Sequence, residues 1–135
     1  MLQTRELFDS MTVKSTLSSD DLVATIDALQ DCVEAATACS AAMLTEDDRA
    51  QLAPAVSHDL DCVDVATATR NVLSRGNGPD TSLISAQLEA CLLACERSYQ
   101  HCHEHAAHHV HCRICSDATQ RCVDQCRHAL AALHH

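Results

Sequence analysis

The chain has 135 residues and a formal charge of −10, so it is long enough for one domain with its own core but has no basic stripe to meet phosphates. Nucleic acid is therefore not an expected partner. No apolar run reaches the roughly 18 residues that a membrane span needs, and residues 1–15 lack a signal-peptide pattern. We expect a cytoplasmic protein with no membrane partner.

The first half of the chain predicts helices. Only two glycines and two prolines occur, which favours long helices over a turn-rich β-fold. Residues 5–11 predict a short helix with Leu7, Phe8 and Met11 on its apolar side. Apolar residues three and four apart then predict a helix over 19–44, opened by a cap at Ser18 or Ser19.

A second long helix is predicted over 46–75, with Thr45 as its cap and Asp48 as the reciprocal partner in a capping box. Pro54 is expected to kink or restart this helix, because an interior proline removes a hydrogen bond. Residues 75–79 (RGNGP) mark the clearest break in the chain. Helices over 81–104 and 108–133 follow.

Four long amphipathic helices with short connections predict an all-α fold, an antiparallel four-helix bundle with a short N-terminal helical segment. We expect a single domain over 1–135. In an up-down-up-down bundle, the connection between the first two long helices and the connection between the last two share one end. Met43 and His58 should then lie in the same half of the bundle as the histidine-rich connection near residue 108.

Cysteine and histidine are concentrated in one stretch. Residues 91–126 hold seven of the ten cysteines and six of the ten histidines. The cysteine spacings there are three, four and seven, with a longer step only at the helix connection, and those intervals return to the same face of a helix. The earlier cysteines also fall on the apolar, inward-facing seams of their helices. The predicted inward cysteines are Cys32, Cys39, Cys62, Cys91, Cys95, Cys102, Cys112, Cys115, Cys122 and Cys126.

The spacing of these thiols predicts metal binding. Thiolates four residues apart, such as Cys91 and Cys95, have Cβ atoms about 5–6 Å apart, which suits two-coordinate binding with metal–sulfur bonds of about 2.3 Å. Soft thiolates favour Cu(I). A structural zinc site usually needs two C-x2-C units on turns, and this chain has one. Several Cu(I) ions along the bundle axis are therefore expected.

Other side chains are weaker candidates as ligands. Histidines near the third connection abut Cys102 and Cys112, and imidazole is a good additional copper ligand. His58 precedes Cys62 by four residues, and Met43 lies on the seam of the first long helix. Asp59 and Asp61 are most simply a solvated helix face. The candidate histidines are His58, His105, His108, His109 and His111.

Alternative functions remain open from the residues alone. One is a Zn(II) or metal-sensing site built from His109, His111, Cys112 and Cys115. A second is a redox or interaction module whose thiols pair between facing helices, and a third, weaker one is an enzyme with a histidine-lined copper centre. No phosphate loop, nucleophile elbow or di-iron motif is present, so we do not expect an enzyme.

The sequence resembles the cysteine-rich four-helix-bundle copper storage proteins of the cytosolic type. The resemblance is carried by HCRICSDATQRCVDQC (111–126), LISAQLEACLLACERSYQHC (83–102) and DLDCVDVATATRNVLSRG (59–76). It implies a bundle whose inward cysteines hold many Cu(I) ions, with histidines at one mouth. It also implies a cytosolic location and a homo-oligomer, commonly a tetramer. All ten cysteines match positions where the family places core ligands.

The chain also departs from this family pattern. Where further cysteines are expected, it has Ala36, His58, Ala66, Ser98 and Thr119. At two thiolates per ion, ten cysteines suit roughly five Cu(I), or more if thiolates are shared and histidines take part. We therefore expect copper binding at a capacity lower than is typical, concentrated on the two C-terminal helices.

Overall fold

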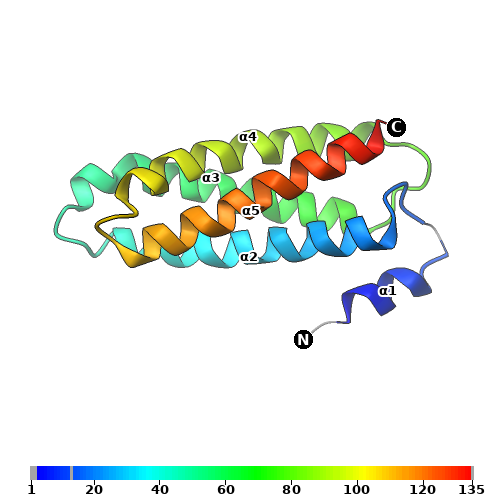
Figure 1. Cartoon of the computed structure of the whole chain (residues 1–135), viewed down its shortest axis with the longest axis horizontal. Helices are drawn as coiled ribbons and strands as arrows, with labels where there is room; N and C mark the ends of the chain where they lie inside the picture. Colours follow the sequence, from blue (N-terminus) through cyan, green and yellow to red (C-terminus); the bar gives the residue numbers. More distant parts are fainter. Residues whose placement is uncertain (1–2, 13, 135) are drawn as a thin grey trace.

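The computed structural model describes residues 3–12 and 14–134. It contains a short helix α1 (Thr4–Ser10) and four long helices, α2 (Ser19–Met43), α3 (Arg49–Ser74), α4 (Ser82–His105) and α5 (Val110–Leu133). The long helices form an antiparallel bundle in which each contacts its chain neighbours and α2 also packs against α5 (Figure 1). The predicted all-α fold is confirmed.

Local signals explain where two of these helices begin. Ser18 caps α2 and accepts a hydrogen bond from the backbone N–H of Asp21 at 3.1 Å, which satisfies one free donor of the first turn. Asp80 accepts from the backbone N–H of Ser82 at 3.0 Å at the start of α4. Both starts agree with the sequence-based expectation.

The start of α3 differs from the prediction. The helix begins at Arg49, and residues 44–48 form turns. The Thr45 hydroxyl donates to the Ala42 carbonyl oxygen at 2.8 Å, at the end of α2, so the predicted capping box does not form. Pro54 lies inside α3 without restarting it. The longer connection brings Glu46 and Asp48 to the end of the bundle.

Helix α1 packs against α2, and Phe8 is its buried side chain. It joins the core beside Leu17 and Leu22. The prediction for Leu7 was wrong, since 43% of its surface is exposed, whereas Met11 is partly buried. α1 therefore covers one end of the bundle through a single aromatic anchor.

The helix connections and the C-terminus define the two ends of the bundle. The α2–α3 and α4–α5 connections share one end, and the α3–α4 connection and the C-terminus lie at the other (Figure 1). We call the first end the mouth. Met43 is fully buried in this half, as expected from the topology. Within the described residues, no helix has the length and apolar character needed to cross a bilayer.

Candidate metal centre

All ten cysteines are buried as free thiols, each at most 1% exposed. They fall into two clusters along the bundle axis. The inner pool lies away from the mouth, and the mouth pool lies next to it. The inner pool is Cys32, Cys62, Cys91, Cys95, Cys122 and Cys126. The mouth pool is Cys39, Cys102, Cys112 and Cys115.

Cys95 is the centre of the inner pool. Its Sγ lies 3.4 Å from that of Cys62, 3.5 Å from Cys122, 3.8 Å from Cys91 and 3.9 Å from Cys32. Bonds of about 2.3 Å would separate two sulfurs by about 4.0 Å in a trigonal site and about 4.6 Å in a linear one. Small side-chain rotations therefore convert these contacts into metal-binding geometry.

Two groups of three thiols show how the inner pool is built. Cys32, Cys95 and Cys122 have sulfurs that all lie within 4.8 Å of one another, and so do Cys91, Cys122 and Cys126. Cys122 belongs to both groups. A thiolate at that position can bridge two ions, which favours a connected cluster over separate mononuclear sites.

The mouth pool contains a buried carboxyl group, that of Asp59. The side chain is fully buried and accepts from the Ser98 hydroxyl at 2.6 Å and from the Cys102 thiol at 3.1 Å. The Cys115 Sγ lies 3.7 Å from both Asp59 oxygens. A four-ligand cluster within 4.8 Å is formed by Cys39, Asp59, Cys102 and Cys115. Asp59 is thus a core residue, and its interpretation as a solvated face was wrong.

Burial raises the pKa of two groups in this half of the core. It raises the pKa of Asp59 to about 7, despite the hydrogen bonds from Ser98 and Cys102. Burial also raises the pKa of the Cys112 thiol to about 12. Both groups are mainly protonated below neutral pH, because a bare charge in this dry interior is unfavourable. A cation that binds here must displace protons.

His111 connects the mouth pool to the surface. Its Nδ1 lies 3.4 Å from the Cys39 Sγ and 3.5 Å from the Cys112 Sγ, and its Nε2 lies 3.0 Å from Glu46 Oε1. Burial lowers the pKa of His111, but the hydrogen bonds to Cys39 and Glu46 outweigh it, so the net pKa is raised. One ring therefore faces thiols on one side and a carboxylate on the other.

His109 faces two carboxylates. Its Nε2 lies 3.1 Å from both oxygens of Asp48, and its Nδ1 lies 3.7 Å from Glu46 Oε2. The hydrogen bond with His109 holds the pKa of Asp48 below its ordinary value. Sequence reasoning missed Glu46 and Asp48 as part of this site, because it placed them in the first turn of a helix.

The other predicted histidines lie elsewhere. His105 is half-buried and His108 exposed, and in the described part of the chain neither belongs to a group able to hold a metal. His58 is half-buried on the outside of the bundle, where its ring stacks on that of His101 with centroids 4.2 Å apart. The prediction that His58 faces the axis was wrong, because Asp59 occupies that position.

Four small side chains stand where further thiols were expected. They are fully buried on the inward faces of the four long helices: Ala36, Ala66, Ser98 and Thr119. The Thr119 hydroxyl donates to the carbonyl oxygens of Cys115 and Ser116 at 2.9 and 3.1 Å. This residue lies between the mouth pool and the inner pool along α5. The ligand row is therefore interrupted at this level.

The alternative zinc site does not assemble from the predicted residues. Cys112 and Cys115 are fully buried and face the axis. In the part of the chain that the structure describes, no candidate metal group joins Cys115 to His109 or His111. His109 and His111 group with Glu46, and His111 also groups with Cys39 and Cys112, so the four predicted residues do not form one site.

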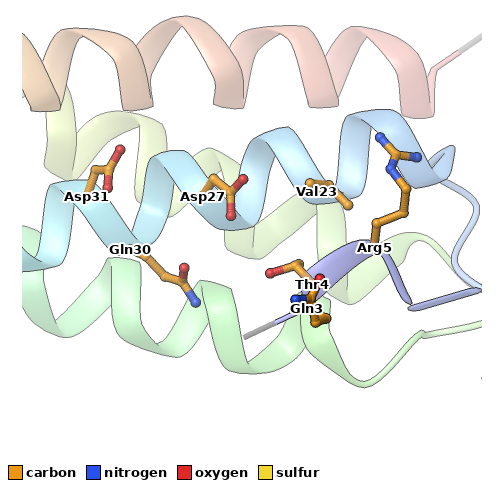
Figure 2. A pocket seen from close by; sticks show the side chains of 7 residues that line it. All are labelled: Gln3, Thr4, Arg5, Val23, Asp27, Gln30 and Asp31. Atoms are coloured by element: carbon orange, nitrogen blue, oxygen red, sulfur yellow. The ribbon is translucent and has the colours of Figure 1, made fainter. Parts of the chain in front are cut away.

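A groove of about 400 Å³ lies between α1 and α2 and is lined mainly by polar and charged side chains (Figure 2). Asp27 and Asp31 extend from α2 on one of its walls, and Arg5 lies at one end, where it pairs with Asp20 at 2.6 Å. Its lining residues are Gln3, Thr4, Arg5, Val23, Asp27, Gln30 and Asp31. No thiol or imidazole contributes to it, so it adds nothing to the metal site.

Comparisons with known proteins agree with this chemistry. The profile of the copper storage protein family matches residues 18–131. A structure of the copper storage protein Ccsp from Streptomyces lividans, loaded with 10 copper equivalents, is 34% identical, with a TM-score of 0.93 over 97% of this chain and 100% of that one. No curated protein sequence matches the chain.

Two further structures of S. lividans proteins are similar. One describes copper loading, with five coppers, to a cytosolic copper storage protein; it is 38% identical, with a TM-score of 0.81 over 83% of this chain and 93% of that one. A Ccsp variant is 36% identical, with a TM-score of 0.84 over 88% of this chain and 99% of that one.

Proposed function

The chain belongs to the copper storage protein family, and from that premise we propose that its ten buried cysteines are the ligands that hold Cu(I) along the bundle axis. Copper storage is the function of the protein, and copper is what it binds. The observation that carries the ligand assignment is the pair of thiol clusters, because soft sulfur donors in mutual contact favour a monovalent soft ion.

The two pools are expected to hold different numbers of ions. At two thiolates per ion the six inner cysteines suit about three Cu(I), and the four mouth cysteines suit about two. Bridging through Cys122 raises that number. The S. lividans relative loaded with 10 copper equivalents supports a capacity above five.

Other groups complete the mouth pool in this proposal. Asp59 supplies a carboxylate oxygen next to Cys102 and Cys115. His111 supplies Nδ1 next to Cys39 and Cys112. His109, His105, His108 and the thioether of Met43 lie at or near the same end and stay predictions as copper ligands. His58 is left out, since its ring packs against His101 on the outside.

The test is an anaerobic titration of the reduced protein with Cu(I) against a chromogenic chelator of known affinity. We expect at least five equivalents to be withdrawn from the chelator. Uptake of one equivalent or less would overturn the storage assignment. A redox or interaction module, one of the alternatives, would instead give reversible disulfides on mild oxidation and no competition with the chelator.

Three properties of the protein are also proposed. The described relative from S. lividans is cytosolic, and a reducing compartment keeps ten thiols free, so we propose the cytosol here too. We propose no catalytic step, since storage accounts for the ligands. A homo-oligomer, a tetramer by family resemblance, stays a prediction that light scattering at several protein concentrations will test.

A further inference from the structure

A second group of ligand atoms lies outside the thiol pools, at the surface of the mouth. We call it the mouth cluster: Glu46, Asp48, His109 and His111. Glu46 and Asp48 come from the α2–α3 connection, His109 caps α5 and His111 lies in its first turn. The two imidazole rings are stacked, with centroids 5.2 Å apart and planes inclined by 18°.

We propose that the mouth cluster binds one divalent cation of the borderline class, such as Zn²⁺, Co²⁺ or Cu²⁺. Glu46, His109 and His111 each offer one ligand atom within 4.8 Å of the others. Their contacts to Glu46 point to His109 Nδ1 and His111 Nε2 as the nitrogen ligands. Two imidazoles and one carboxylate form a three-ligand set that leaves a fourth position open to water.

The spacing of these atoms fits such an ion. Bonds of about 2.0–2.1 Å in a tetrahedral site place neighbouring ligand atoms about 3.3 Å apart. The observed separations are 3.0 Å from Glu46 Oε1 to His111 Nε2 and 3.7 Å from Glu46 Oε2 to His109 Nδ1. Both values lie close to the tetrahedral spacing, but they join different oxygens of Glu46. An ion bound here is therefore held by both oxygens, or by one after a rotation of the carboxylate.

Asp48 contacts the nitrogen of the His109 ring that does not face Glu46. Its two oxygens lie 3.1 Å from His109 Nε2. Because a carboxylate accepts hydrogen bonds, the ring N–H is at Nε2 and donates a hydrogen bond to Asp48. The lone pair is then on Nδ1, which faces Glu46. A carboxylate that fixes the tautomer of a ligating histidine is a common feature of metal sites and raises affinity about 10–100-fold.

The site is accessible, and its chemistry differs from that of the thiol pools. The exposed fractions of the side chains are 15% for His109, 25% for His111 and 33% for Glu46, so an ion reaches them without opening the bundle. Nitrogen and oxygen donors prefer divalent ions, whereas the thiol pools prefer Cu(I). A simple ion pair between these histidines and acids is the alternative.

His111 links the two kinds of site. A neutral imidazole has one lone pair, which is on Nε2 or on Nδ1. On Nε2 it serves the mouth cluster, and on Nδ1 it faces Cys39 and Cys112. Given the proposed copper function, a divalent ion at the mouth therefore competes with Cu(I) in the mouth pool for this ring.

The experiment is a titration of the reduced, metal-free chain with Co²⁺ under anaerobic conditions, followed by absorbance. We expect one equivalent to bind with weak ligand-field bands and without the strong near-ultraviolet bands of cobalt–thiolate bonds. His109→Ala and Glu46→Gln should abolish this signal, and Asp48→Asn should weaken binding about tenfold or more. His103→Ala is the matched control and should bind normally, since His103 is exposed and outside the cluster.

Three results would overturn the proposal: no binding, a cobalt–thiolate spectrum at the first equivalent, or unchanged binding in both Glu46→Gln and His109→Ala. Circular dichroism of each variant verifies that the helices are intact. The Cu(I) titration of the unmodified chain is done on the same preparation. A chain that takes up Cu(I) but not Co²⁺ refutes only the mouth cluster, whereas the reverse result refutes only the copper assignment.

Discussion

The two thiol pools are built from the same residue type but in different surroundings. In the inner pool, Cys95 touches four other cysteines, and aliphatic side chains such as Leu29 and Leu88 belong to the same buried cluster. In the mouth pool, four cysteines share the space with the carboxyl of Asp59 and the ring of His111. The inner pool is an all-sulfur environment, and the mouth pool mixes sulfur with nitrogen and oxygen.

This difference predicts that tight storage of Cu(I) and fast exchange of Cu(I) occur in different pools. An all-sulfur pool away from solvent holds Cu(I) tightly, because every donor is soft. The mouth pool has harder donors and lies next to surface histidines, so ions there should bind less tightly and exchange faster. Storage in this bundle is therefore expected to have a slow compartment and a fast one.

The largest expected effect is on capacity. Replacing Cys95 with Ala removes the thiol at the centre of the inner pool and should lose about two Cu(I), whereas Cys126→Ala, at its edge, should lose about one. Anaerobic Cu(I) titration of both variants measures this. Equal losses would contradict the view of Cys95 as the centre of a connected cluster.

The next effect is a pH dependence that belongs to the mouth pool alone. The pKa of Asp59 is raised by burial to about 7 from a usual value of 3.8. Between these two pKa values the native state keeps a proton that the unfolded chain has lost, so stability declines as pH rises from about 4 to about 7 and levels off above that. Between pH 5 and 8 the metal-free protein should lose about 3 kcal/mol of unfolding free energy.

Asp59→Asn removes this titration while it keeps the shape of the side chain, so its stability should fall much less over the same range. Denaturant unfolding of the reduced, metal-free protein at several pH values measures the slope. Asp61→Asn is the matched control, because Asp61 is exposed on the same helix. An unchanged slope in Asp59→Asn would show that another group is responsible.

A smaller effect is expected at the link between the mouth pool and the surface. His111→Ala removes the imidazole that lies 3.4 Å from the Cys39 Sγ, so capacity should fall by at most about one Cu(I). The rate at which a chelator withdraws the first ions should change more than the total. Stopped-flow absorbance follows that rate, and His103→Ala serves as a control, because His103 is exposed and is not a predicted ligand. A variant with normal rates would remove His111 from the copper path.

Much of the structure behind this comparison of the two pools could be predicted from the sequence. The helical spacing of the cysteines, together with the apolar seams on which the earlier ones fall, placed all ten thiols on inward faces, and the structure buries every one. The same periodicity predicted the four long helices to within a few residues. These features depend on local repeats, which a helix converts directly into one face.

The features that were missed depend on choices between near-equal alternatives. Both His58 and Asp59 are spaced to share a face with Cys62, and a neutral ring is usually preferred over a carboxyl in a core. The bundle nevertheless buries Asp59, because Ser98 and Cys102 donate hydrogen bonds to it. Those partners lie 39 and 43 residues away, and no local pattern on α3 reveals them.

The last prediction joins the two pools. Thr119 is fully buried on α5, one turn from both Cys115 and Cys122, and its hydroxyl donates to the backbone carbonyls of Cys115 and Ser116. Thr119→Cys should add a thiol at the interrupted level and raise capacity by about one Cu(I), with Thr119→Ser as the oxygen-bearing control. If the pools are separate compartments, the added thiol should also merge fast and slow release into one phase. Two phases that persist despite the extra ion would mean that Asp59, rather than the gap in the sulfur row, keeps the pools apart.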